Sequence, residues 1–182
     1  MILPQLLNVT KILHGGMRDD SISILYAEWF EELEKIYRSD SRFEERFKKL
    51  SMVVCYRVQA EPAWGIEKDI IFGNELDAGK LIKLGFYSED DAKKEATFLL
   101  AATPQNWKKL LRKETKFVTD FMLGKIKLEQ GSKVGILKLA PLSDKLVDFM
   151  TQHEIQFPDE MSSDELAKYR SHLEEFRSKV GV

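Results

Sequence analysis

The first part of the chain alternates apolar and polar residues with the period of an α-helix. Its large apolar residues recur every three or four positions: Ile22, Leu25, Tyr26, Trp29, Leu33 and Ile36. This spacing predicts a helix over residues 22–36 with one apolar stripe, capped at its start by Asp20 or Ser21. A shorter helix is predicted over residues 41–50, where Ser41 and Glu44 have the spacing of a capping box.

The period of the pattern then shortens to two, which is typical of β-strands. Strict alternation predicts a first strand over residues 52–58. Similar patterns predict three further strands, at residues 64–72, 82–86 and 97–102. Residues 73–79 begin and end with glycine, so we expect a turn there. A short polar helix is expected between the third and fourth strands, over residues 88–94.

A helix is predicted to follow the fourth strand, because Thr103 is a good cap and Pro104 suits the first helical position. Its apolar spacing continues to Gly124, which is expected to end the helix in a left-handed conformation. Residues 125–129 alternate again and predict a fifth strand.

The remainder of the chain is predicted to be helical. An apolar helix starts at residue 133, is interrupted by Pro141 and resumes over residues 142–152. Ser162 and Glu165 form the capping box of a last amphipathic helix, which either packs on the core or extends as an arm. The order of elements indicates an α+β fold.

Composition places the chain among single-domain soluble proteins. It has 182 residues, 43% of them hydrophobic, and a net charge of −2. This balance argues against nucleic acid as a partner. The chain has no apolar run long enough for a membrane span and no signal peptide, so a cytoplasmic location is expected.

The near-neutral total hides a local excess of positive charge. Residues 104–138 carry nine basic side chains against three acidic ones, so this segment is +6 and the rest of the chain is −8. Either these basic side chains contact anionic lipid, or they form a solvated face paired with acidic residues from Glu28 to Glu45.

The sequence lacks the common catalytic motifs. The three histidines (His14, His153 and His172) have no metal-ligand spacing, and there is no nucleophile elbow, P-loop or dinucleotide fingerprint. Cys55, the only cysteine, lies within an apolar strand and is interpreted as a core residue. We therefore expect no enzyme activity, no metal and no cofactor.

One segment resembles a known family. Residues 124–131 (Gly-Lys-Ile-Lys-Leu-Glu-Gln-Gly), running into residues 132–139 (Ser-Lys-Val-Gly-Ile-Leu-Lys-Leu), are similar to the C-terminal signature of the sterol carrier protein type-2 family. The order of elements over residues 20–152 fits that family too. Residues 1–19 and 153–182 extend beyond the usual domain, and Pro141 splits a helix that is usually continuous.

The resemblance implies a five-stranded, mostly antiparallel sheet covered by helices, with an apolar tunnel between them. It further implies non-covalent binding of a fatty acyl chain, acyl-coenzyme A, sterol or isoprenoid lipid. Any single candidate for the tunnel wall fits a close-packed core better, whereas residues 107–122 as a group are the better candidates for the wall. The candidates are Phe98, Leu100, Trp107, Leu111, Phe117, Phe121, Met122, Ile126, Leu128, Ile136, Leu139, Phe149 and Met150. The candidates for contact with an anionic headgroup or membrane are Lys108, Lys109, Arg112, Lys113 and Lys116.

Two other functions stay open at this point. The first is a protein-interaction or regulatory subunit with a filled core, whose last helix (residues 163–180) docks on a partner or on a second copy to form a homodimer. The second is an enzyme with a polar pair inside an apolar cavity, for which Tyr56, Arg57 and His153 are the only candidates.

Overall fold

A five-stranded mixed sheet forms the centre of the computed structural model, which describes residues 21–25 and 27–180. The strands lie in the order β4-β3-β2-β5-β6. Only β2 and β5 pair in parallel, while the other neighbours are antiparallel. Their bounds are β2 Met52–Val58, β3 Ile70–Asp77, β4 Lys80–Tyr87, β5 Phe98–Ala102 and β6 Lys127–Gln130. The predicted α+β class with a mostly antiparallel five-stranded sheet is confirmed.

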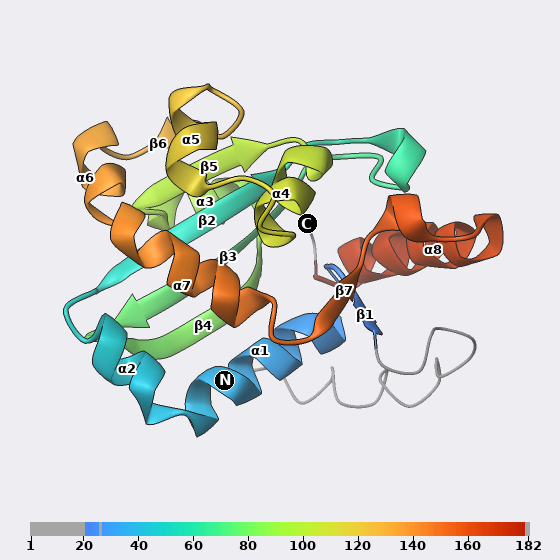
Figure 1. Cartoon of the computed structure of the whole chain (residues 1–182). Helices are drawn as coiled ribbons and strands as arrows, with labels where there is room; N and C mark the ends of the chain where they lie inside the picture. Colours follow the sequence, from blue (N-terminus) through green and yellow to red (C-terminus); the bar gives the residue numbers. More distant parts are fainter. Residues whose placement is uncertain (1–20, 26, 181–182) are drawn as a thin grey trace.

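Helices cover both faces of this sheet (Figure 1). On one face, α1, α2, α4 and α7 pack over the apolar residues of β2, β3 and β5. On the other, Ala92 in the middle of α3 and Ala96 just after it pack on Cys55, Tyr87 and Leu99. The helices are α1 Ala27–Ser39, α2 Ser41–Phe47, α3 Glu89–Glu95, α4 Pro104–Leu111, α5 Phe117–Met122, α6 Lys133–Lys138 and α7 Ala140–Met150. No helix within the described residues is long and apolar enough to cross a membrane.

The start of the first helix differs from the prediction. Residues Ser21–Ser23 form a short strand, β1, that pairs in parallel with β7, Glu154–Gln156. The helix begins only at Ala27, after Leu25 takes a positive φ of 65°. Ser21 is therefore not its cap, and Asp20 lies outside the described residues. The sequence pattern gave the wrong element here because Ile22 has the spacing of a helix. Its partner in the β1–β7 pair, Ile155, lies more than 130 residues later in the chain.

Three other local predictions are also corrected. The second helix is capped by Asp40, whose side chain accepts a hydrogen bond from the Arg42 N–H, and not by Ser41. The strand predicted at residues 64–72 is preceded by a 3-10 helix, η1 Pro62–Trp64, and begins at residue 70. The strand then continues through residues 73–77, where a turn was predicted. Gly73 lies within the strand, at a point where the backbone of β2 approaches too closely for a side chain. A Cβ atom at this position would lie 2.6 Å from the Val54 carbonyl oxygen.

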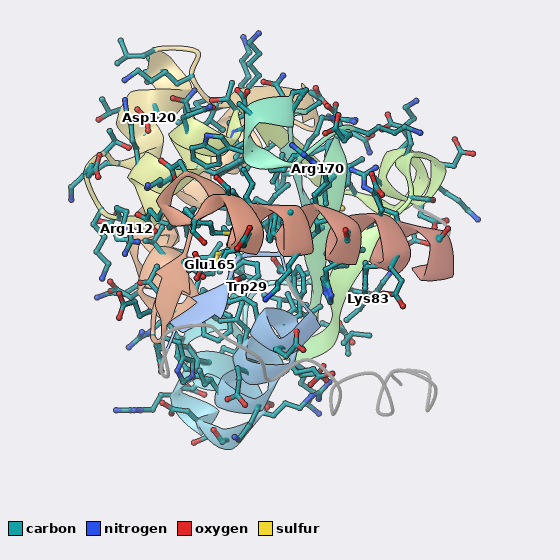
Figure 2. All side chains as sticks on the ribbon, turned by 90° about the vertical axis from the view of Figure 1, so that its right-hand side faces the viewer. Trp29, Lys83, Arg112, Asp120, Glu165 and Arg170 are labelled. Carbon is teal, nitrogen blue, oxygen red and sulfur yellow. The ribbon has the colours of Figure 1, made fainter. Side chains whose placement is uncertain are left out.

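The last helix, α8 Ser163–Val180, packs on the domain and is not an exposed arm. It follows a 3-10 helix, η2 Pro158–Glu160, and has the predicted capping box, in which Glu165 accepts a hydrogen bond from the Ser162 N–H at 2.7 Å. Tyr169 and Leu173 are buried, and the ring of Phe176 lies 4.6 Å from that of Phe86. Figure 2 shows α8 lying across the molecule, and Arg170 donates a hydrogen bond to the Pro62 carbonyl.

Candidate ligand-binding cavity

An apolar cavity of about 140 Å³ lies between the sheet and the helices that cover its inner face. Alternation along the strands points one set of side chains into it, so Val54, Tyr56, Phe72 and Leu100 form the floor. A void of this size lined by hydrocarbon stays free of ordered water and accepts apolar guests. The arrangement therefore suits binding of an apolar group.

Helices α1, α4, α5, α6 and α7 supply most of the rest of the wall, to which Phe47 of α2 and Leu81 and Leu84 of β4 also contribute. The apolar stripe of α1 contributes Trp29, Phe30 and Leu33. On α4, Trp107 faces the cavity and donates a hydrogen bond of 2.9 Å from Nε1 to the Arg57 carbonyl, which fixes this helix to β2. One part of the wall is therefore formed by α1, a helix of 13 residues. Another part is formed by α5 and α6, which are short helices of six residues each.

The structure places eight of the thirteen candidate wall residues on the cavity: Leu100, Trp107, Leu111, Phe117, Ile136, Leu139, Phe149 and Met150. The other five, Phe98, Phe121, Met122, Ile126 and Leu128, are not among the residues that line it. Phe98 lies instead against Gly131 and Gly135, and the Met122 side chain is 71% exposed. The role of all thirteen in binding stays a prediction.

Sequence reasoning missed the part of the wall that comes from the N-terminal half of the chain and from the first turns of α7. Trp29, Phe30, Leu33, Leu142 and Leu146 line the cavity but were not named as candidates. The signal for Trp29 and Leu33 was present, because both belong to the apolar stripe of the predicted first helix, whereas Phe30 is not part of that stripe. Nothing in that periodicity distinguishes a side chain that borders a cavity from one in a close-packed core.

The few polar groups on the cavity are uncharged. Tyr56 donates a hydrogen bond of 3.3 Å from its hydroxyl to Asn74 Oδ1, and burial raises the pKa of Tyr56, which keeps it neutral. The indole N–H of Trp29 has no hydrogen-bond partner within the described chain. No charged side chain is among the described residues that line the cavity. An ionised group placed inside would have no counter-charge there.

The five basic candidates lie on α4 and in the segment that follows it, and four of them form ion pairs within the chain. Lys108 and Arg112 bind carboxylates of η2, with Glu160 within 2.9 Å of each. Lys113 pairs with Asp148 of α7 at 2.7 Å, and Lys116 pairs with Asp144 at 3.3 Å. Their acidic partners therefore lie in residues 144–160, and not between Glu28 and Glu45 as expected for a solvated face.

The residues considered for catalysis are not brought together. Tyr56 and Arg57 are neighbours on β2, so they point to opposite faces of the sheet, and His153 is 42% exposed beside Glu32. Burial raises the pKa of the Cys55 thiol to about 12, so the group stays protonated. Among the described residues, no group of three or more His, Cys, Asp or Glu side chains is arranged to hold a metal ion.

On the outer face of the sheet, Arg57 is bound by three carboxylates. Its guanidinium hydrogen-bonds to Glu89 at 2.7 Å and to Glu129 at 2.8 Å, and Asp69 lies 3.4 Å away. These contacts link β2 to β6 and to the start of α3. The side chain of Arg57 is only 11% exposed, so its pairing is shielded more than that of an ordinary surface residue.

Replacing Glu89 with Gln is expected to weaken the response of stability to acid. Hydrogen bonds from Arg57 lower the pKa of Glu89 from 4.5 to about 2. Because the folded-state pKa is depressed, the carboxylate stabilises the fold above about pH 4.5 and loses this effect as the pH falls to 2. Thermal unfolding followed across this range should show a smaller drop in Tm for Glu89→Gln than for the wild type. Glu174→Gln, on the exposed side of α8, is the control, and equal slopes for Glu89→Gln and the wild type would refute the linkage.

Comparison with known proteins identifies the fold. No protein-family model and no curated protein sequence matches the chain. Among solved structures, a crystal structure of sterol carrier protein 2 aligns with a TM-score of 0.62 at 15% identity, covering 72% of this chain and 99% of the other. The solution structure of a conserved hypothetical protein from Thermus thermophilus, described as possibly a sterol carrier protein, aligns with a TM-score of 0.64 at 15% identity, covering 78% and 97%. The chain therefore has the fold of sterol carrier protein 2.

Proposed function

We propose that this protein is a carrier that binds an apolar ligand non-covalently between its sheet and its helices. The observation that carries the proposal is the uncharged, almost wholly apolar cavity at that place in a sterol-carrier fold. Fatty acyl chains, acyl-coenzyme A, sterols and isoprenoid lipids all present the apolar surface that such a cavity accepts. No chemical step is assigned to the cavity.

The uncharged wall limits which part of a ligand enters. A carboxylate or a phosphate buried there would have no cation beside it, so charged headgroups stay outside. A hydroxyl or carbonyl group is better suited, because the Tyr56–Asn74 pair and the Trp29 N–H offer hydrogen bonds to an uncharged partner. An ordinary lipid thus enters tail first, or with a neutral polar end.

The wall must move to admit a whole lipid. The cavity measures about 140 Å³, whereas pockets that enclose drug-sized ligands span about 300–1,000 Å³. The short helices α5 and α6 are held by few residues, and the exposed ion pairs of Lys113 and Lys116 with α7 are weak enough to open. We expect the ligand to enlarge the space by displacing these helices from α7.

Native mass spectrometry of the purified protein, together with solvent extraction, tests the proposal. We expect a bound species that is released on unfolding and that contains an alkyl or isoprenoid chain. Displacement of a fluorescent fatty acid by the extracted material should follow a one-site curve. If no lipid co-purifies and no apolar probe binds, the proposed function is refuted.

A further inference from the structure

Exposed apolar side chains are concentrated on one small part of the surface. Among the described residues, six large hydrophobic side chains are exposed, and five of them lie between residues 118 and 137: Val118, Met122, Leu123, Val134 and Leu137. Met122, Leu123 and Val134 are between 65% and 71% exposed. They belong to α5, to the turn after it and to α6, on either side of β6 (Figure 1). Exposed apolar side chains that gather on one part of a surface are a feature of protein and membrane contact sites.

Basic side chains without acidic partners occupy the same place. Lys127, Lys133 and Lys138 form no ion pair with any described residue, whereas Lys108, Arg112, Lys113 and Lys116 are all paired. The two acidic residues of this stretch are both engaged internally. Asp120 is 1% exposed, with Lys125 3.5 Å from its carboxylate, and Glu129 binds Arg57 at 2.8 Å. The surface is therefore both apolar and positively charged.

The helices that carry this surface are apolar on their inner side too. Phe117 of α5 and Ile136 of α6 are buried and line the cavity, while Met122 and Val134 point to solvent. An apolar side chain on the outer side of such a helix is stabilised by contact with a second apolar phase. Both helices lie at the β6 edge of the sheet, at the opposite end of the molecule from α8, where the fold leaves them uncovered (Figure 1).

We propose that this surface docks on an anionic phospholipid bilayer. We define it as the α5–α6 face, made of Val118, Met122, Leu123, Lys127, Lys133, Val134, Leu137 and Lys138. The exposed apolar side chains enter the region between headgroups and acyl chains, while the lysines contact lipid phosphates. A positively charged surface complements an anionic membrane, which is why a bilayer fits better than a second, equally basic copy of this face.

Docking through this face extends the proposed function. The α5–α6 face and the cavity lie on opposite sides of the same two helices. A bilayer docked on this face is therefore separated from a ligand in the cavity only by these helices. The argument for docking rests on exposed side chains and charge, and it does not require the cavity to be occupied. The two proposals can therefore fail separately.

Co-sedimentation with phosphatidylcholine vesicles, with and without phosphatidylglycerol, tests the docking. The wild type should bind vesicles containing phosphatidylglycerol and lose most of this binding at high salt. Replacing Met122, Leu123 and Val134 with Ser should weaken the binding at least about tenfold. Replacing Lys127, Lys133 and Lys138 with Gln should remove the preference for phosphatidylglycerol.

Matched controls lie elsewhere on the surface. Ile82→Ser removes the sixth exposed apolar side chain, on β4, and the triple change of Lys68, Lys80 and Lys94 to Gln removes three exposed lysines outside the face. Both controls should bind vesicles like the wild type. Equal vesicle binding by the face variants and the controls overturns the proposal. So does a dimer that the serine variant dissociates while no form of the protein binds vesicles.

A separate measurement keeps the docking distinct from ligand binding. Binding of a fluorescent fatty acid in vesicle-free solution should be unchanged when only Leu123 and Val134 are replaced with Ser, since neither position lines the cavity and neither is a candidate wall residue. Loss of vesicle binding with retained probe binding supports docking through this face. Vesicle binding by a protein that takes up no probe would leave the docking supported and the proposed function refuted.

Discussion

Replacing Leu111 with Trp is expected to abolish binding of a fluorescent fatty acid. Leu111 lies on α4, is 7% exposed and borders the cavity. The larger indole occupies the space of about 140 Å³ that the ligand enters first. Because a ligand must then push a packed ring aside, affinity should fall by at least about 100-fold. Probe titration measures this loss, and urea unfolding should show a cost of about 1–3 kcal/mol for overpacking.

Two further variants separate blocking from unfolding. Leu111→Met conserves the side-chain volume, so it should keep both stability and probe binding. Leu139→Trp enters the same cavity from the half-buried end of α6, where the packing tolerates a shift more easily. If either Trp variant folds and still binds the probe like the wild type, the ligand lies outside this cavity.

Local patterns predicted most of the fold because the sheet is built from strands whose alternation is visible in the sequence. Strands β2, β4 and β5 were placed within two residues of their ends. The turn predicted at residues 73–79 was wrong at its start, because a glycine such as Gly73 permits a close approach between strands as well as a turn. The β1–β7 pair was missed because two three-residue strands have almost no pattern, and only the tertiary fold brings them together.

The candidate site was predictable to the extent that it follows the apolar faces of helices. Trp107 and Leu111 were found on the cavity because the helix they occupy has a clear stripe. Met122 shares the apolar character of that segment but is exposed, because α5 ends at this residue and the chain turns away. The acidic partners of the basic residues could not be predicted from the sequence either. Lys113 pairs with Asp148, and only the packing of α4 beside α7 shows this.

Replacing Trp29 with Ala is expected to cause a large loss of stability. Trp29 is 1% exposed, and its ring lies 5.0 Å from that of Phe30 and 5.8 Å from that of Phe72. Removing the ring from the contact between α1 and the sheet should cost about 3–5 kcal/mol. That is a large part of the roughly 5–15 kcal/mol by which domains are stable. Urea unfolding monitored by far-UV circular dichroism should show the midpoint falling at an unchanged slope.

Trp29→Phe distinguishes the ring from its polar group. The indole N–H of Trp29 is buried and has no hydrogen-bond partner within the described chain. Phenylalanine keeps most of the apolar contact and removes this unpaired donor, so its cost should be about 1–2 kcal/mol, well below that of Ala. A bound ligand that accepts a hydrogen bond from this N–H would stabilise the wild type more than Trp29→Phe. Equal costs for the Phe and Ala variants in lipid-free protein would mean that the N–H is bonded and that the cavity is more polar than its lining indicates.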